Sequence, residues 1–174
     1  MSMVSTCQLN PYEVISVEKK FSGLKNVIDL AGLKTYFSNL CNATFFAPTN
    51  DALASNPALV EYLAEPQNKQ LLIDVLKYHV YPFAALTTSQ LVPTTILPMS
   101  NGKITTIYAA LYYPFVPVVQ DQIQQNFDVT EGNISSSTMT YIQAINGILQ
   151  PEVIYYAKYL NPPNSIWNKE QLNG

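Results

Sequence analysis

Apolar residues recur every three or four positions in the first part of the chain. From Pro11 to Leu40 this spacing is that of a helical face. Gly23 and Gly32 interrupt the stretch, so we expect two or three short helices rather than one long one. Pro11 suits the first turn of a helix, and Asn10 before it suits the N-cap position.

The pattern then changes to a strand followed by further helices. Residues 43–48 (ATFFAP) are short, apolar and aromatic, which is typical of a buried strand that ends at a proline. Residues 49–51 (TND) offer a cap and a first-turn carboxylate for a new helix. A second helical spacing covers residues 68–78, and Pro82 ends it.

The chain beyond residue 80 has a different character. Between Val80 and Gln120 the only formal charge is Lys103, and threonine, isoleucine and tyrosine are frequent, which favours strands. Residues 104–108 and 138–149 are the clearest strand predictions. Because helices precede most of the strands, the pattern indicates the α+β class.

Composition and charge exclude several classes of protein. A chain of 174 residues fits one domain, and 48% hydrophobic with only 12% charged residues excludes a disordered chain. The net charge is −3, and all nine basic residues are lysines. Without arginine or a basic excess, we expect no nucleic acid among its partners.

The sequence offers no recognisable catalytic or cofactor chemistry. The six glycines never form a phosphate-binding spacing. His79 is the only histidine, and the two cysteines lack zinc-ligand spacing. No serine motif would complete a triad with His79. We therefore predict no metal, no cofactor and no enzyme activity; an enzyme or an accessory to one is retained only as a third hypothesis.

Localisation signals are few. Residues 1–10 lack the basic start and apolar run of a signal peptide, so the protein is either cytoplasmic or secreted with a leader that this chain lacks. No apolar run is long enough for a membrane span. Cys7 and Cys41 would form one disulfide or remain two buried thiols. Asn42 and Asn133 head glycosylation sequons, which favour secretion but also arise by chance.

Three segments resemble, in the expected order, the signature segments of the fasciclin-like domain family. They are residues 44–53 (TFFAPTNDAL), 76–82 (LKYHVYP) and 142–151 (IQAINGILQP). The resemblance covers residues 10–151 and implies N-terminal helices packed against a mixed β-sheet or β-wedge. Relative to the family, residues 109–127 look like an aromatic insertion. Residues 152–174 form a C-terminal extension, packed on the domain or trailing it.

The closing segment departs from the family pattern. Gln143 and Asn146 stand where the family usually carries histidine and aspartate, so the resemblance is safer for the fold than for any function that depends on charge. Asn146 and Gly147 alone would indicate a tight hairpin. Their register with the family instead predicts a bend or bulge within the closing strand.

The resemblance implies a non-catalytic module for cell adhesion or matrix binding, outside the cell or at its surface, with a protein or matrix partner. In some family members the Tyr-His segment is linked to receptor binding, and that role would fall on Tyr78 and His79. The alternative is that both side chains are structural, with His79 hydrogen-bonded at the end of a helix.

A second hypothesis is a carrier of an apolar or aromatic small molecule, carotenoid-like or lipid-like. It rests on the uncharged aromatic segment 108–116, since binding pockets are largely apolar and tyrosine adds a polar anchor. The same segment would otherwise pack against a second copy of the chain or complete the core. Its candidate binding residues are Tyr108, Tyr112, Tyr113 and Phe115.

Overall fold

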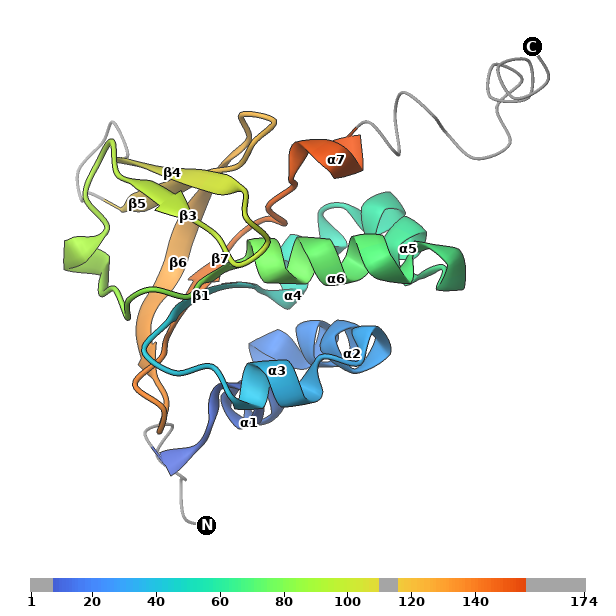
Figure 1. Cartoon of the computed structure of the whole chain (residues 1–174), viewed down its shortest axis with the longest axis horizontal. Coiled ribbons are helices and arrows are strands. Elements are labelled where there is room, and N and C mark those ends of the chain that lie inside the picture. Colours follow the sequence, from blue (N-terminus) through green and yellow to red (C-terminus); the bar gives the residue numbers. More distant parts are fainter. Residues whose placement is uncertain (1–7, 110–115, 156–174) are drawn as a thin grey trace.

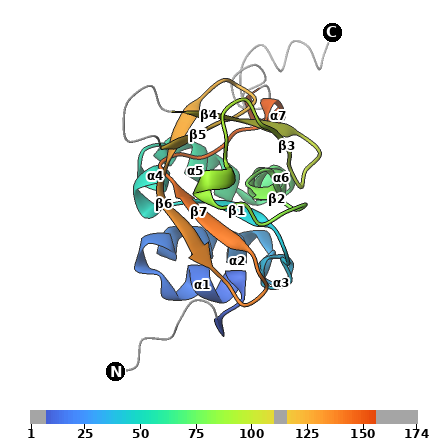
Figure 2. The same cartoon turned by 90° about the vertical axis from the view of Figure 1, so that its left-hand side faces the viewer.

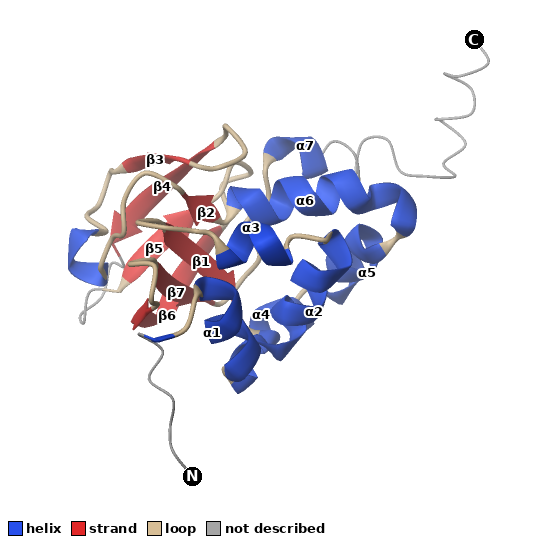
Figure 3. Cartoon of the chain, turned by 60° about the horizontal axis from the view of Figure 1, so that its bottom comes forward, coloured by secondary structure: helices blue, strands red, loops and turns tan. Residues whose placement is uncertain are grey.

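The computed structural model describes residues 8–109 and 116–155. The strands lie on one side of the molecule and most helices gather on the other (Figures 1 and 3). This two-layer arrangement confirms the α+β class. Among the described residues, no helix combines the length and apolar character needed to cross a membrane.

The helices are short, as the interrupted pattern predicts. Asn10 caps the first of them by accepting the N–H of Glu13 at 2.9 Å. Gly32 ends α2 in the left-handed conformation, with φ of +71°. Gly23 does not divide two helices and lies inside α2, which starts one residue earlier. The helices are α1 (Pro11–Val17), η2 (Lys19–Phe21), α2 (Ser22–Ala31), α3 (Lys34–Ser38), α4 (Asn50–Ala54), α5 (Pro57–Ala64), η3 (Pro66–Asn68), α6 (Lys69–Tyr78), η4 (Thr88–Gln90) and α7 (Glu152–Tyr155).

The strands form one mixed, seven-stranded sheet with the order β2-β1-β7-β6-β5-β4-β3 (Figure 2). Among the strands of the described residues, β1 and β7 pair in parallel, and the other neighbours in the sheet are antiparallel. The strands are β1 (Thr44–Pro48), β2 (Val80–Tyr81), β3 (Ile96–Pro98), β4 (Ile104–Ala109), β5 (Pro117–Gln120), β6 (Asn126–Ser135) and β7 (Tyr141–Ile145).

The closing strand is shorter than the predicted range of residues 138–149. It ends at Ile145, and Asn146 and Gly147 form a bend after the strand rather than within it. The ring of Phe127 packs directly on the backbone here, because a Cβ built on Gly147 would lie 2.0 Å from two ring atoms. The chain therefore turns away from the sheet at Gly147, where the lack of a side chain lets the Phe127 ring lie against the backbone.

The expected insertion at residues 109–127 is partly built into the sheet. β5 pairs with β4 on one side and with β6 on the other. These pairings make residues 117–120 an internal strand of the sheet. Residues 110–115, which include Tyr112, Tyr113 and Phe115, lie outside the described residues, as does the extension beyond residue 155.

Strand β1 separates two hydrophobic cores, and its five residues are all buried, as its sequence predicts. Phe45 and Ala47 contribute to the core shared with the helices. Phe46 contributes to the second core, inside the curved sheet, together with Tyr78. The end of α6 and the segment after β7 therefore each contribute residues to both cores.

Candidate functional site

His79 is a buried residue with both ring nitrogens in hydrogen bonds. Nδ1 lies 2.7 Å from the carbonyl oxygen of Val75, and Nε2 lies 2.9 Å from the amide nitrogen of Leu149. An amide N–H can only donate, so Nε2 is the acceptor and Nδ1 carries the proton. Burial lowers the pKa of His79 to about 4, which keeps the ring neutral at pH 7.

Tyr78 is also fully buried. Its hydroxyl donates to the carbonyl oxygen of Ile104 at 2.6 Å, and burial raises its pKa to about 12. Because 0% of Tyr78 and 1% of His79 are exposed, neither side chain can touch a partner of the folded domain. Tyr78 and His79 therefore do not form a receptor-contact surface; they join α6 to the sheet and to the segment after β7.

Tyr108 is 40% exposed on β4 and lines an open cleft of about 420 Å³. We call this the hairpin cleft, because it lies between the loop leading into β3 and the β4–β5 hairpin. Its lining is mainly apolar and consists of Thr88, Ser89, Leu91, Val92, Pro93, Tyr108, Val116 and Pro117.

The loop wall of the hairpin cleft is held by polar side chains of the sheet, of which Gln143 and Thr44 are buried and Asn133 is exposed. Gln143, on β7, is fully buried and donates to the carbonyl oxygen of Leu86 at 2.8 Å. The N–H of Leu86 donates to Thr44 Oγ1 at 2.8 Å, and the N–H of Thr88 donates to Asn133 Oδ1 at 2.9 Å. Gln143 is therefore a structural residue that anchors this loop to the sheet.

A second cleft, of about 480 Å³ and lined by polar and charged residue types, lies where the helical layer meets the sheet. We call it the seam cleft. It brings together residues from η2, the start of α4, β6 and the bend after β7. Its lining consists of Lys19, Lys20, Thr49, Asn50, Asp51, Thr130 and Asn146.

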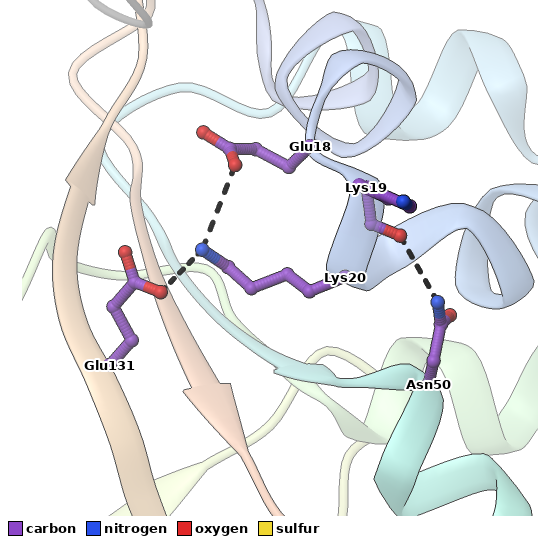
Figure 4. Close-up of polar contacts among 5 residues, drawn as sticks. All are labelled: Glu18, Lys19, Lys20, Asn50 and Glu131. Atoms are coloured by element: carbon purple, nitrogen blue, oxygen red, sulfur yellow. Dashed lines mark hydrogen bonds and ion pairs between the residues drawn. The ribbon is translucent and has the colours of Figure 1, made fainter.

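Ion pairs and an amide hold the seam cleft in shape (Figure 4). Lys20 pairs with Glu131 on β6 and, at 3.6 Å, with Glu18. The Asn50 amide donates to the carbonyl oxygen of Lys19 at 3.0 Å. Its carbonyl accepts the N–H of Gly23 at 2.9 Å. Helix α2 is thus joined to α4, and η2 to β6.

Two charged side chains of the seam cleft are free to contact a partner. Lys19 and Asp51 are both exposed, and neither forms an ion pair within residues 8–109 and 116–155. This cleft could not be predicted from the sequence, because its four segments are far apart in the chain. The only local signal was that residues 49–51 and Asn146 fall within two of the signature segments.

The two sequons differ in their surroundings. Asn42 is exposed, and its amide lies 3.5 Å from the sulfur of Cys41, which is an exposed, unbridged thiol. Asn133 is exposed but its side chain is bonded to the backbone of Thr88 and to Gln143. Cys7 lies outside the described residues.

Metal binding has little support in the described part of the chain. No three His, Cys, Asp or Glu side chains there lie close enough together to hold a metal ion.

Comparisons with known proteins agree on one family. The fasciclin domain family model matches residues 19–151. The chain is 36% identical over 94 residues to protein sll1483 of Synechocystis sp., a match that covers 53% of this chain and 52% of that protein. It is also 36% identical over 64 residues to stabilin-2 of Mus musculus, covering 36% of this chain and 2% of stabilin-2.

The fold has a solved counterpart. A FAS1 domain pair from the insect cell adhesion molecule fasciclin I superposes with a TM-score of 0.72 at 14% identity. The match covers 84% of this chain and 52% of that one. The chain therefore spans about half of fasciclin I's domain pair and of sll1483, and a small part of stabilin-2.

Proposed function

The chain belongs to the fasciclin domain family, and from that premise we propose that it is a non-catalytic interaction module that acts outside the cell or at its surface. Fasciclin I is itself described as a cell adhesion molecule, which supports a role in adhesion or matrix binding. The expected partner is a protein or a matrix polymer.

The seam cleft is the proposed contact surface. The observation that carries this proposal is the convergence in one cleft of residues from two signature segments, with exposed Lys19 and Asp51 among them. A cation and a carboxylate in one cleft that is lined by polar and charged residues suit a partner that offers both charges and hydrogen-bonding groups. Such complementary charges contribute to specificity and association rate more than to affinity alone.

Binding to cells or matrix from the source organism tests this proposal. We expect saturable binding of the fluorescently labelled protein, measured by flow cytometry. The double variant Lys19→Ala/Asp51→Ala should weaken binding by about tenfold or more, because two fully formed polar contacts are lost. Lys69→Ala, on the far end of the helical layer, is the matched control and should bind as the wild type does.

The outcome that contradicts the proposal is equal binding by all three proteins. A partner that contacts another surface would give that result. Equal unfolding midpoints for the variants and the wild type ensure that a loss of binding is not a loss of fold.

The hairpin cleft supports a second candidate function, that of a carrier for an apolar, carotenoid-like or lipid-like molecule. The specific observation is an open cleft of about 420 Å³ that is lined mostly by apolar groups, with Tyr108 as a polar anchor. Two of its lining residues, Tyr108 and Val116, lie on either side of the aromatic segment 110–115 in the sequence.

Copurification tests the carrier function. Protein from its own source should show extra mass in native mass spectrometry that disappears on denaturation, and visible absorbance if the ligand is a carotenoid. Tyr108→Ala should reduce the bound fraction, while Met139→Ala, at an exposed turn, should not. A bare mass and a colourless protein would contradict this function.

A further inference from the structure

The helical layer carries an apolar groove where α2 and α5 end and α6 begins. Its outer part is a cleft of about 180 Å³. Its inner part is a smaller cavity of about 30 Å³ that extends to the segment after β7. Both parts are lined by Leu30, Leu63, Ala64 and Leu72, so they form one continuous groove, which we call the helix groove.

The helix groove presents apolar side chains to solvent. Its inner part is lined by apolar residues and the buried ring of His79. Leu30, at its mouth, is 51% exposed, although Ile28 and Ala31 of the same helix belong to the core. An apolar groove that opens to solvent indicates a place where another segment or molecule packs.

The chain leaves its last described helix on the same side of the molecule. Ile148 lines the inner part of the groove, and Ile154 of α7 belongs to the core of the helical layer. Helix α7 lies beside α6 (Figures 1 and 3). We call residues 156–174 the C-terminal tail. Trp167 is twelve residues beyond Tyr155, a stretch that spans up to about 40 Å when extended, so it can reach every part of the groove.

The C-terminal tail carries one compact apolar pair among polar neighbours. Residues 166 and 167 (IW) are followed by the opposite charges of residues 169 and 170 (KE). The outer part of the groove likewise carries one charge of each sign, Glu65 and Lys69. Neither of these forms an ion pair within the described part of the chain. The tail therefore offers an apolar group for the groove and a countercharge for each charge at its mouth.

We propose that the helix groove is the docking site of the C-terminal tail, with Trp167 seated in its outer part. A flexible tether of this length gives an effective concentration of about 1 mM. An intrinsic affinity of only about 0.1 mM then makes the docked form about tenfold more populated than the free form. Docking makes the tail a part of the domain and covers apolar surface that is otherwise open to solvent.

Tryptophan fluorescence of the full chain tests the docking, because Trp167 is its only tryptophan. Emission of the folded protein should be blue-shifted, and acrylamide should quench it less, than in the urea-unfolded chain. Leu30→Lys puts a charge at the mouth of the groove and retains a good helix former, so it should raise the quenching constant about threefold. Val17→Lys is the matched control, since Val17 is 60% exposed at the end of α1 and lies outside the groove.

A second variant keeps the test decisive if Leu30→Lys does not fold. Ala64 is exposed at the end of α5, and Ala64→Lys should raise the quenching in the same way. Equal urea midpoints for the variants and the wild type exclude a loss of fold. Quenching should not change over about a hundredfold dilution, because the tail docks on its own chain.

Three results would overturn the docking. One is a folded wild type whose Trp167 is quenched as strongly as in the unfolded chain. Another is a folded groove variant with the quenching of the wild type, which would place Trp167 elsewhere. The third is quenching that rises on dilution, which would assign the groove to the tail of a second copy.

Discussion

The Tyr78 hydroxyl donates to a backbone carbonyl inside the sheet core, 2.6 Å from the oxygen of Ile104. Replacing it in Tyr78→Phe removes one buried hydrogen bond and leaves that oxygen without this donor. We expect a loss of about 1 kcal/mol in the free energy of unfolding, measured with urea. Binding to source cells should be unchanged, because the side chain does not reach the surface; a selective loss of binding at full stability would contradict the structural role.

Gly147 offers a second single-residue test. A Cβ at this position would enter the ring of Phe127, so Gly147→Ala should destabilise the protein by about 2–3 kcal/mol in urea unfolding. Adding Phe127→Leu should recover part of the loss. Gly102→Ala is the control, since Gly102 has φ of +84° and nothing within 4 Å, and should cost only about 1 kcal/mol. Equal costs at the two glycines would contradict the packing argument.

Local and long-range contacts explain which residue roles were predictable. Asn10 as the cap of α1 follows from its own neighbours in the sequence. The role of His79 does not, because its partner Leu149 is 70 residues away. The sequence left two roles open for this residue, and only the fold brings its acceptor nitrogen to that amide.

Helix α2 depends on another element for its N-terminal cap. Its own N-cap residue, Phe21, has no side-chain acceptor, and Asn50 of α4 accepts the N–H of Gly23 instead. Asn50→Ala should lower the free energy of unfolding by about 1–2 kcal/mol. Asn50→Asp keeps this acceptor but loses the amide donors to Lys19 and Ser22, so it should fall between the wild type and Asn50→Ala. Thermal unfolding would measure the series; an alanine variant as stable as the wild type would contradict it.

The elements that could be predicted are those in which apolar residues recur at a regular spacing along the sequence. The helices and the buried strand β1 follow from apolar spacing and from caps. Strands β2, β3 and β5 have only two to four residues, too few to establish an alternation. Strand β6 has ten residues but is mostly polar and exposed on one face, with shifts in its pairing to β7. Its place in the sheet is set by its partners rather than by its own pattern.

The whole domain constrains which sequon is available to a modifying enzyme. Asn42 lies outside the strands, and within the described part of the chain its side-chain amide makes only a 3.5 Å contact with the sulfur of Cys41. Asn133 lies within β6 and its side chain is bonded to Thr88 and Gln143. Expressed in a host that glycosylates secreted proteins, the chain should carry a glycan at Asn42 and none at Asn133, measured by peptide mass spectrometry. An occupied Asn133 in a fully folded protein would contradict this.

The two clefts sit at different places in the architecture. The seam cleft joins the helical layer to the sheet, and the hairpin cleft lies at the β4–β5 hairpin. Neither could be assembled from the sequence, because each needs the register of strands that the sequence did not predict. The signature segments nevertheless contributed residues to the seam cleft, and this is why that cleft is central to the proposed function.

Site-resolved photo-crosslinking on source cells tests that central claim most directly. A photoreactive residue would replace Thr130 in the seam cleft, Ser89 in the hairpin cleft, or Lys69 as a control. The account predicts a covalent adduct with a cell-surface or matrix macromolecule from position 130 and none above background from positions 89 and 69. Adducts from position 89 alone, or from all three positions equally, would contradict it.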